Sequence, residues 1–214
     1  VIATVGMLRP EKGQAELLRV VQRLRGQGIP AVALVVGMPT PSTRPYAYEL
    51  YRLAVDLGIA EHVVFAGHRT DVPDMIHAAD VVLVPSATEA WSRIVPESFA
   101  VGRPVVASAV GGLPEIVSPG RTGWLAAPGD VSGYADCIMQ IRSHPQQAQA
   151  IVTNAWAFAQ ANFRLDGKMF SRWRRIDGRQ AEPSPARNQP RIPVTIRICP
   201  TPFSCTFMQP DTCG

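Results

Sequence analysis

Two carboxylates, Glu89 and Glu97, lie eight positions apart on either side of a short turn. An apolar run over 80–84 comes just before them and a helix is predicted over 97–101, so the turn joins the carboxyl end of a strand to a helix. Free backbone N–H groups and the helix dipole favour phosphate at such a place, and carboxylates accept hydrogen bonds from hydroxyl groups. The stretch predicts a ligand that carries both groups, such as a nucleotide-sugar.

The strands and helices that must position these residues alternate along the chain. Short apolar runs predict six strands, over 1–5, 31–36, 62–66, 80–84, 104–107 and 124–126. Apolar residues at helical spacing predict helices over 14–25, 46–57, 72–79, 97–101, 131–143, 146–162 and 165–176. Strands that alternate with helices in this way form βαβ units, so the predicted fold class is α/β with a parallel sheet.

The other candidate site residues also follow predicted strands. The stretches after the first five strands are 6–13, Gly37, 67–69, 85–95 and 110–113. In an open parallel sheet the ligand lies beyond the carboxyl ends of the strands, where these stretches meet. The sequence therefore predicts that residues far apart in the chain line one cleft.

Five pieces of the chain, kept in order and spacing, resemble the nucleotide-sugar-binding half of a retaining glycosyltransferase of family 4 (glycosyl transferases group 1). They are GMLRPEKG at 6–13, PS at 85–86, the Glu89–Glu97 pair, GRPVVA at 102–107 and GGLPE at 111–115. The resemblance runs from residue 1 to about residue 175. It implies a Rossmann-like parallel sheet with helices on both faces, which is one half of the two-domain GT-B fold.

The resemblance implies three catalytic residues. Lys12 would neutralise the diphosphate of the donor, with a solvated loop lysine as the alternative. The family usually has arginine where this chain has Met7, and Arg9 is the candidate replacement. Glu89 would contact hydroxyl groups of the transferred sugar. Glu97 would accept hydrogen bonds from the ribose hydroxyls, with a helix N-terminal charge as the alternative.

The remaining substrate-binding candidates surround the phosphates and the nucleobase. Gly6 belongs to the phosphate loop, and Gly37, His68 and Arg69 would border the nucleobase. His68 is interpreted as a residue at the rim of the site and not as a catalytic base. The turn before the helix would offer backbone N–H groups, and Arg93 would add charge or face solvent. By name these candidates are Gly6, Gly37, His68, Arg69, Ser92, Arg93, Ile94 and Val95. Gly111 and Gly112 would permit a tight turn close to the ligand.

Composition narrows the class of protein. The chain has 214 residues, 46% of them hydrophobic, and its net charge of +4 does not indicate a nucleic-acid partner. No apolar run is long enough to span a bilayer and no leader opens the chain, so we expect a cytoplasmic location. The cysteines, Cys137, Cys199, Cys205 and Cys213, lack metal-ligand spacing. With no Asp-x-Asp motif either, we expect no metal and no cofactor besides the nucleotide-sugar donor.

The predicted organisation is one domain followed by a tail. Residues 1–180 form the donor-binding domain, and 181–214, with seven prolines, form a Pro-rich tail that is irregular or disordered. The predicted helix over 165–176 is rich in arginine. A solvated helix face is the preferred interpretation, and peripheral contact with the anionic inner face of a membrane is the alternative.

The resemblance implies transfer of a sugar from a nucleotide diphosphate to an acceptor hydroxyl with retained anomeric configuration. The acceptor, a glycan or lipid, would bind an N-terminal domain that this chain lacks, so the chain alone should bind the donor and transfer little. The alternatives are a non-catalytic nucleotide-binding module and a GT-B-type nucleotide-sugar epimerase. The sequence leaves open whether the donor is linked to UDP, GDP or ADP.

Overall fold

The computed structural model describes residues 1–163 of the 214-residue chain. The predicted helix over 165–176, the end of the predicted domain and the predicted tail over 181–214 lie outside the described residues.

The described residues form one parallel sheet. Its strands are β1 (Ile2–Val5), β2 (Ala33–Val36), β3 (Val63–Gly67), β4 (Val81–Val84), β5 (Val105–Ser108) and β6 (Trp124–Ala126). Their spatial order is β3-β2-β1-β4-β5-β6, and every neighbouring pair is parallel. The order reverses between β1 and β4, and open parallel sheets bind ligands beyond the carboxyl ends of the strands at such a point. The predicted α/β class and the six predicted strands are confirmed.

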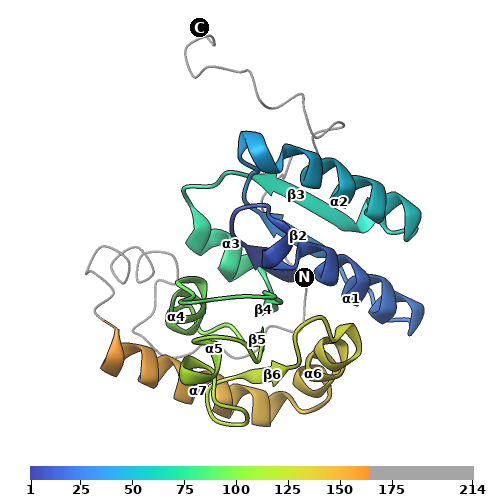
Figure 1. Cartoon of the computed structure of the whole chain (residues 1–214). Coiled ribbons are helices and arrows are strands. Elements are labelled where there is room, and N and C mark those ends of the chain that lie inside the picture. The colour runs from blue at the N-terminus through green and yellow to red at the C-terminus, as the bar shows by residue number, and fades with distance from the viewer. Residues whose placement is uncertain (164–214) are drawn as a thin grey trace, which may run out of the picture.

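Helices cover both faces of this sheet (Figure 1). The α-helices are α1 (Gln14–Gly26), α2 (Arg44–Asp56), α3 (Val72–Ala78), α4 (Ile94–Ala100), α5 (Leu113–Ile116), α6 (Val131–Ser143) and α7 (Pro145–Asn162). Three short 3₁₀ helices join them to the strands: η1 (Pro10–Lys12), η2 (Pro41–Thr43) and η3 (Ala60–His62). Helices α1, α2 and α6 lie on one face, and α3 and α4 lie on the other. Helix α7 contributes Ala148 and Ile151 to the first cluster and Ala155 and Ala159 to the second.

The alternation of side chains along each strand divides the core in two. In β1, Ile2 packs into the cluster under α1 and α2, whereas Ala3 packs into the cluster under α3. In β4, Leu83 belongs to the first face and Val82 to the second. Because successive side chains of a strand point to opposite faces, a strand covered on both sides must be apolar throughout. This is why the strands read as continuous apolar runs.

Helix α4 begins three residues before the predicted helix, at Ile94. Pro96 does not interrupt it, because a proline in the first turn removes an N–H group that has no helical partner there. Six of its seven residues are buried, and Glu97 is the one that is not. The short elements η1, η2, η3 and α5 were not predicted.

Candidate functional site at the carboxyl edge of the sheet

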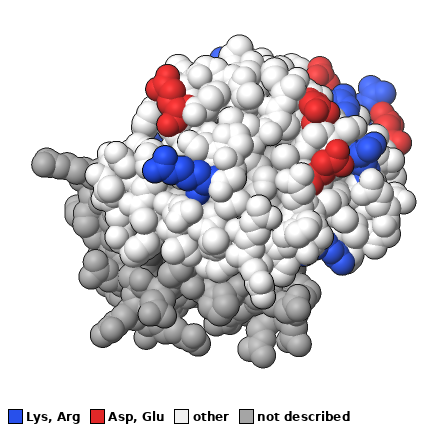
Figure 2. Space-filling model, turned by 90° about the horizontal axis from the view of Figure 1, so that it is seen from below, with Lys and Arg blue, Asp and Glu red and all other residues white. Residues whose placement is uncertain are grey.

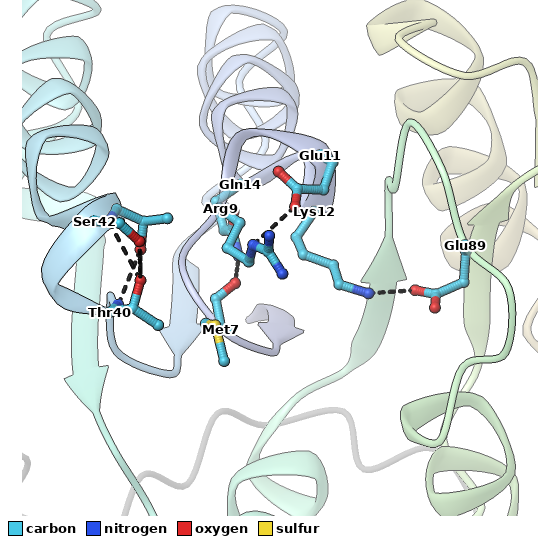
Figure 3. Close-up of polar contacts among 9 residues, drawn as sticks. Met7, Arg9, Glu11, Lys12, Gln14, Thr40, Ser42 and Glu89 are labelled. Atoms are coloured by element: carbon cyan, nitrogen blue, oxygen red, sulfur yellow. Dashed lines mark hydrogen bonds and ion pairs between the residues drawn. The ribbon is translucent and has the colours of Figure 1, made fainter.

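Lys12 and Glu89 meet where the loops after β1 and β4 converge. The Nζ atom of Lys12 lies 2.7 Å from Oε2 of Glu89, and Figure 3 shows the lysine extending from its own loop toward the carboxylate on the next. The hydroxyl of Ser86 donates to the same oxygen at 3.3 Å. The carboxylate is 9% exposed and the lysine side chain 32%. The structure thus brings together two of the three predicted catalytic residues.

Backbone contacts fix these two loops against each other. The N–H group of Ala87 donates to the carbonyl of Glu11 at 2.9 Å. A Cβ atom on Gly13 would come within 2.1 Å of the carbonyl oxygen of Pro85, so only glycine allows the β1 loop to approach the β4 loop this closely. Lys12 immediately precedes this contact, and its position is therefore set by the backbone of both loops.

The loop after β5 supports Glu89 from the other side. The N–H group of Gly112 donates to the carbonyl of Glu89 at 3.2 Å. Gly111 has φ +50°, and a Cβ atom on it would lie 1.8 Å from the same carbonyl oxygen. The backbone of the β5 loop therefore packs directly against the backbone of Glu89, and the close approach of this glycine pair to a ligand stays a prediction.

Glu97 opens toward the same edge from the first turn of α4. Its side chain is 16% exposed, and its carboxylate lies 3.6 Å from the guanidinium of Arg93, whose side chain is 83% exposed. Burial raises the pKa of Glu97 above its ordinary value, and the charge of Arg93 opposes that rise. A half-buried carboxylate with only an exposed, distant cation beside it can accept hydrogen bonds from a ligand.

This raised pKa has a consequence for stability. A carboxyl whose pKa is higher in the folded state binds its proton more readily there, so it lowers the free energy of unfolding as pH rises from its unfolded pKa through its folded pKa. We expect Glu97→Gln to increase the free energy of unfolding at neutral pH and to remove that part of the pH dependence just above pH 4.5, the ordinary value of this pKa. Urea unfolding of both proteins between pH 4 and 8 measures the difference, and a mutant less stable than the wild type at pH 7 would contradict it.

Arg9 is held by its own loop. Its Nε atom lies 2.8 Å from Oε1 of Glu11, and both side chains are more than a third exposed. Met7, in the place where the family usually has arginine, is 46% exposed. The amide of Gln14, a wholly buried side chain, donates to the carbonyl of Met7 at 3.0 Å and so ties the start of α1 to this loop (Figure 3). Nothing in the spacing pattern of the sequence identified this glutamine.

Gly6, of the predicted phosphate loop, follows β1, and the residues predicted to border the nucleobase, Gly37, His68 and Arg69, follow β2 and β3. The N–H group of Gly6 donates to the carbonyl of Val36 at 2.9 Å, and that of Gly37 donates to the carbonyl of Gly67 at 2.8 Å. The following loop is closed by a capping box in which Thr40 and Thr43 exchange hydrogen bonds. Backbone hydrogen bonds therefore link the carboxyl end of β1 to that of β2, and the carboxyl end of β2 to that of β3.

The two side chains after β3 differ in how firmly they are held. His68 is exposed. Arg69 makes two contacts with Asp71 of its own loop, at 2.8 and 2.6 Å, which raises the pKa of the guanidinium. Arg69 is thus paired with Asp71, two positions later in the same loop.

Residues 91–95, where the β4 loop leads into α4, are buried except for Trp91 and Arg93. Ser92 is 4% exposed, and the first-turn residues Ile94 and Val95 are buried, with no side chain capping the helix. Trp91 is 51% exposed, and its ring meets Phe163 edge-on with 5.8 Å between centroids. Phe163 makes a second such contact with Phe158 of α7. This aromatic cluster, which links the site loop to the end of α7, was not predicted.

A cavity of about 470 Å³ lies between α1 and α2, and Pro10 of the β1 loop is one of its lining residues. Tyr46 lines it, and its hydroxyl accepts a hydrogen bond from the N–H group of Ala15 at 3.3 Å. Burial raises the pKa of Tyr46 to about 12, so this hydroxyl stays protonated. None of the predicted site residues is among those that line this cavity.

Within residues 1–163, no group of three or more His, Cys, Asp and Glu side chains is placed to hold a metal ion. None of the helices in this range combines the length and the apolar character needed to cross a bilayer. On the face drawn in Figure 2, acidic and basic side chains are interspersed and most of the surface between them is uncharged. That face carries no concentrated basic patch of the kind that binds nucleic acid.

Comparison with known proteins places the chain among glycosyltransferases. The family model described as glycosyl transferases group 1 matches residues 1–157. The D-inositol 3-phosphate glycosyltransferase of Mycobacteroides abscessus is 38% identical over 163 residues, which cover 74% of this chain and 36% of that protein. The enzyme of the same name from Mycobacterium marinum is 39% identical and is covered to 35%. The chain therefore spans about a third of the length of the curated relatives it matches.

Solved structures share the fold. The Anabaena protein HepE, crystallised with UDP, is 30% identical, with a TM-score of 0.72, over 83% of this chain and 48% of that one. The same protein crystallised with UDP-glucose gives the same TM-score. The described residues correspond to one Rossmann-like half of a GT-B glycosyltransferase. The chain belongs to the glycosyl transferases group 1 family.

Proposed function

We propose that this chain binds a nucleotide-diphosphate sugar at the carboxyl edge of its sheet and serves as the donor half of a retaining glycosyltransferase of family 4. One observation carries the proposal. Lys12 and Glu89, which are 77 positions apart in the chain, lie 2.7 Å from each other, next to the start of a buried helix whose one accessible residue is Glu97. A cation and two carboxylates at a strand edge suit the phosphate and the hydroxyl groups of such a donor.

The roles follow from the chemistry of each group. Lys12 neutralises negative charge on the diphosphate, which becomes the leaving group. Glu89 accepts hydrogen bonds from the sugar, and Glu97 accepts them from the ribose. As the bond between the sugar carbon and the diphosphate breaks, its electron pair leaves with the diphosphate. The acceptor oxygen bonds to that carbon on the same face, and the proton of the acceptor hydroxyl passes to the departing diphosphate. No metal or organic cofactor is needed in this scheme.

UDP-sugars are the first donors to test, because the similar protein HepE was crystallised with UDP and with UDP-glucose. The acceptor would bind a part of the protein that precedes this domain, either a glycan or lipid or, as the names of the similar mycobacterial enzymes suggest, D-inositol 3-phosphate. The chain alone is then expected to bind the donor without transferring the sugar. Release of UDP by the full-length parent with each acceptor would distinguish an enzyme from a nucleotide-binding module.

The direct test is calorimetric titration of the 214-residue chain with UDP-glucose, a GDP-sugar and an ADP-sugar. One nucleotide class should bind. Glu97→Ala should raise its Kd by about tenfold to hundredfold, since hydrogen bonds to a charged acceptor are lost. Glu61, exposed at the opposite edge of the sheet just before β3, provides the matched control, and Glu61→Ala should leave the Kd unchanged. Failure of every nucleotide-sugar to bind, or equal affinity in Glu97→Ala and wild type, would overturn the proposal.

A further inference from the structure

Each of the four basic side chains predicted for the site is already paired with a carboxylate. The pairs are Arg9–Glu11 at 2.8 Å, Lys12–Glu89 at 2.7 Å, Arg69–Asp71 at 2.6 Å and Arg93–Glu97 at 3.6 Å. Three of them join residues within four positions of each other. An arriving diphosphate therefore does not meet free cations and must compete with carboxylates for them.

The pair between Lys12 and Glu89 differs from the other three. It joins loops from two different strands, and it includes the least exposed carboxylate of the set, at 9%. When a phosphate takes the lysine, Glu89 loses its charged partner and keeps the hydroxyl of Ser86, 3.3 Å from the same oxygen. A carboxylate removed from water in this way needs new hydrogen-bond donors, and a phosphate beside it repels it.

We propose that Glu89 makes the site selective for the intact nucleotide-sugar over the spent nucleotide diphosphate, and that its pairing with Lys12 promotes product release. The inference rests on the proposed function. With the donor bound, hydroxyl groups of the sugar donate to Glu89 and replace the hydrogen bond from Lys12. Once the sugar has been transferred, no donor remains, and the carboxylate competes with the diphosphate for the lysine.

The higher negative charge of the product also favours its release. A free nucleoside diphosphate ends in a phosphate whose second pKa is about 6, so at neutral pH it carries about one more negative charge than the diphosphate of a nucleotide-sugar. That added charge lies nearest to the place of the departed sugar, which Glu89 faces in the proposed site. Repulsion is therefore larger for the product than for the substrate.

The test is a comparison of UDP and UDP-glucose affinities in Glu89→Gln and wild type by calorimetry on the 214-residue chain. The amide keeps the shape of the side chain but removes the charge, and Lys12 is exposed enough to be solvated without it. We expect Glu89→Gln to bind UDP about threefold to tenfold more tightly and UDP-glucose about threefold more weakly, so that the preference between the two ligands collapses. Glu61→Gln, the same change at the opposite edge, should alter neither Kd.

Two further measurements separate the outcomes. In a Lys12→Met background, Glu89→Gln should improve UDP binding less than it does in wild type, because the competition for the lysine is gone and only the direct repulsion between carboxylate and phosphate remains. If wild type binds both ligands but Glu89→Gln leaves UDP affinity equal or weaker, this inference is wrong while the proposed function stands. If neither UDP nor UDP-glucose binds wild type, and GDP and ADP with their sugars do not bind either, the proposed function fails and the inference fails with it.

Discussion

Gly111→Ala is expected to lower the free energy of unfolding by about 3 kcal/mol or more and to disrupt the donor site at the same time. The residue has φ +50°, which disfavours any side chain, and its Cβ atom would lie 1.8 Å from the carbonyl oxygen of Glu89. A flexible side chain could move aside, but this neighbour is backbone. Relief of the clash must displace Glu89, and with it the contact to Lys12.

Two control variants distinguish the cost of a positive φ angle from the cost of a steric clash at the Cβ atom. Gly58 has φ +67° with nothing within 4 Å of its Cβ position, so Gly58→Ala should cost about 1 kcal/mol. Gly26, at the end of α1, has neither feature, and Gly26→Ala should be neutral or stabilising by up to about 1 kcal/mol. Urea unfolding of the three variants measures the series. A Gly111→Ala variant as stable as Gly58→Ala would show that the β5 loop does not hold Glu89 in place.

The fold was predictable because the same pattern, a short apolar run and then a helix, recurs several times along the sequence. Each buried strand is a short apolar run, and every strand except β5 is followed by a predicted helix with apolar residues, so a shift of one or two residues leaves the topology unchanged. The start of α4 was predicted three residues too late for a local reason. Pro96 stands in its first turn, where proline is tolerated, and the N-cap residue, Arg93, makes no side-chain hydrogen bond that caps the helix.

The site was predictable only in part. Position along the chain placed Lys12 and Glu89 at neighbouring strand ends, since loops at one edge of a parallel sheet must converge. Position does not determine which carboxylate a long cationic side chain selects. Arg9 and Arg69 turn onto Glu11 and Asp71 within their own loops, because a nearby partner requires less ordering of the side chain than a distant one. The hydrogen bond from Gln14 to the carbonyl of Met7 depends on the burial of this side chain, and the sequence pattern does not show that a single glutamine is buried.

Lys12→Met should have the largest effect on binding, raising the Kd for UDP-glucose by about 100-fold, equivalent to about 2.7 kcal/mol. The side chain keeps its length and loses the charge that the diphosphate needs. Glu89, 9% exposed, then loses its partner, so the free energy of unfolding should also fall by about 1–2 kcal/mol. Adding Glu89→Gln to Lys12→Met should restore most of that stability without restoring affinity, because the uncompensated charge is gone but the phosphate still lacks its cation.

Arg23→Met is the matched control for this change. Arg23 is exposed near the end of α1, at the opposite edge of the sheet, so the variant loses the same charge without approaching the site. Its UDP-glucose affinity should stay within about twofold of wild type at 0.15 M salt, where charges farther apart than about 8 Å are largely screened. If Lys12→Met also keeps wild-type affinity, phosphate recognition must pass to Arg9, which would have to leave Glu11 on binding. Arg9→Met would then produce the loss that Lys12→Met does not, since the loop after β1 carries no other basic side chain between Gly6 and Gly13.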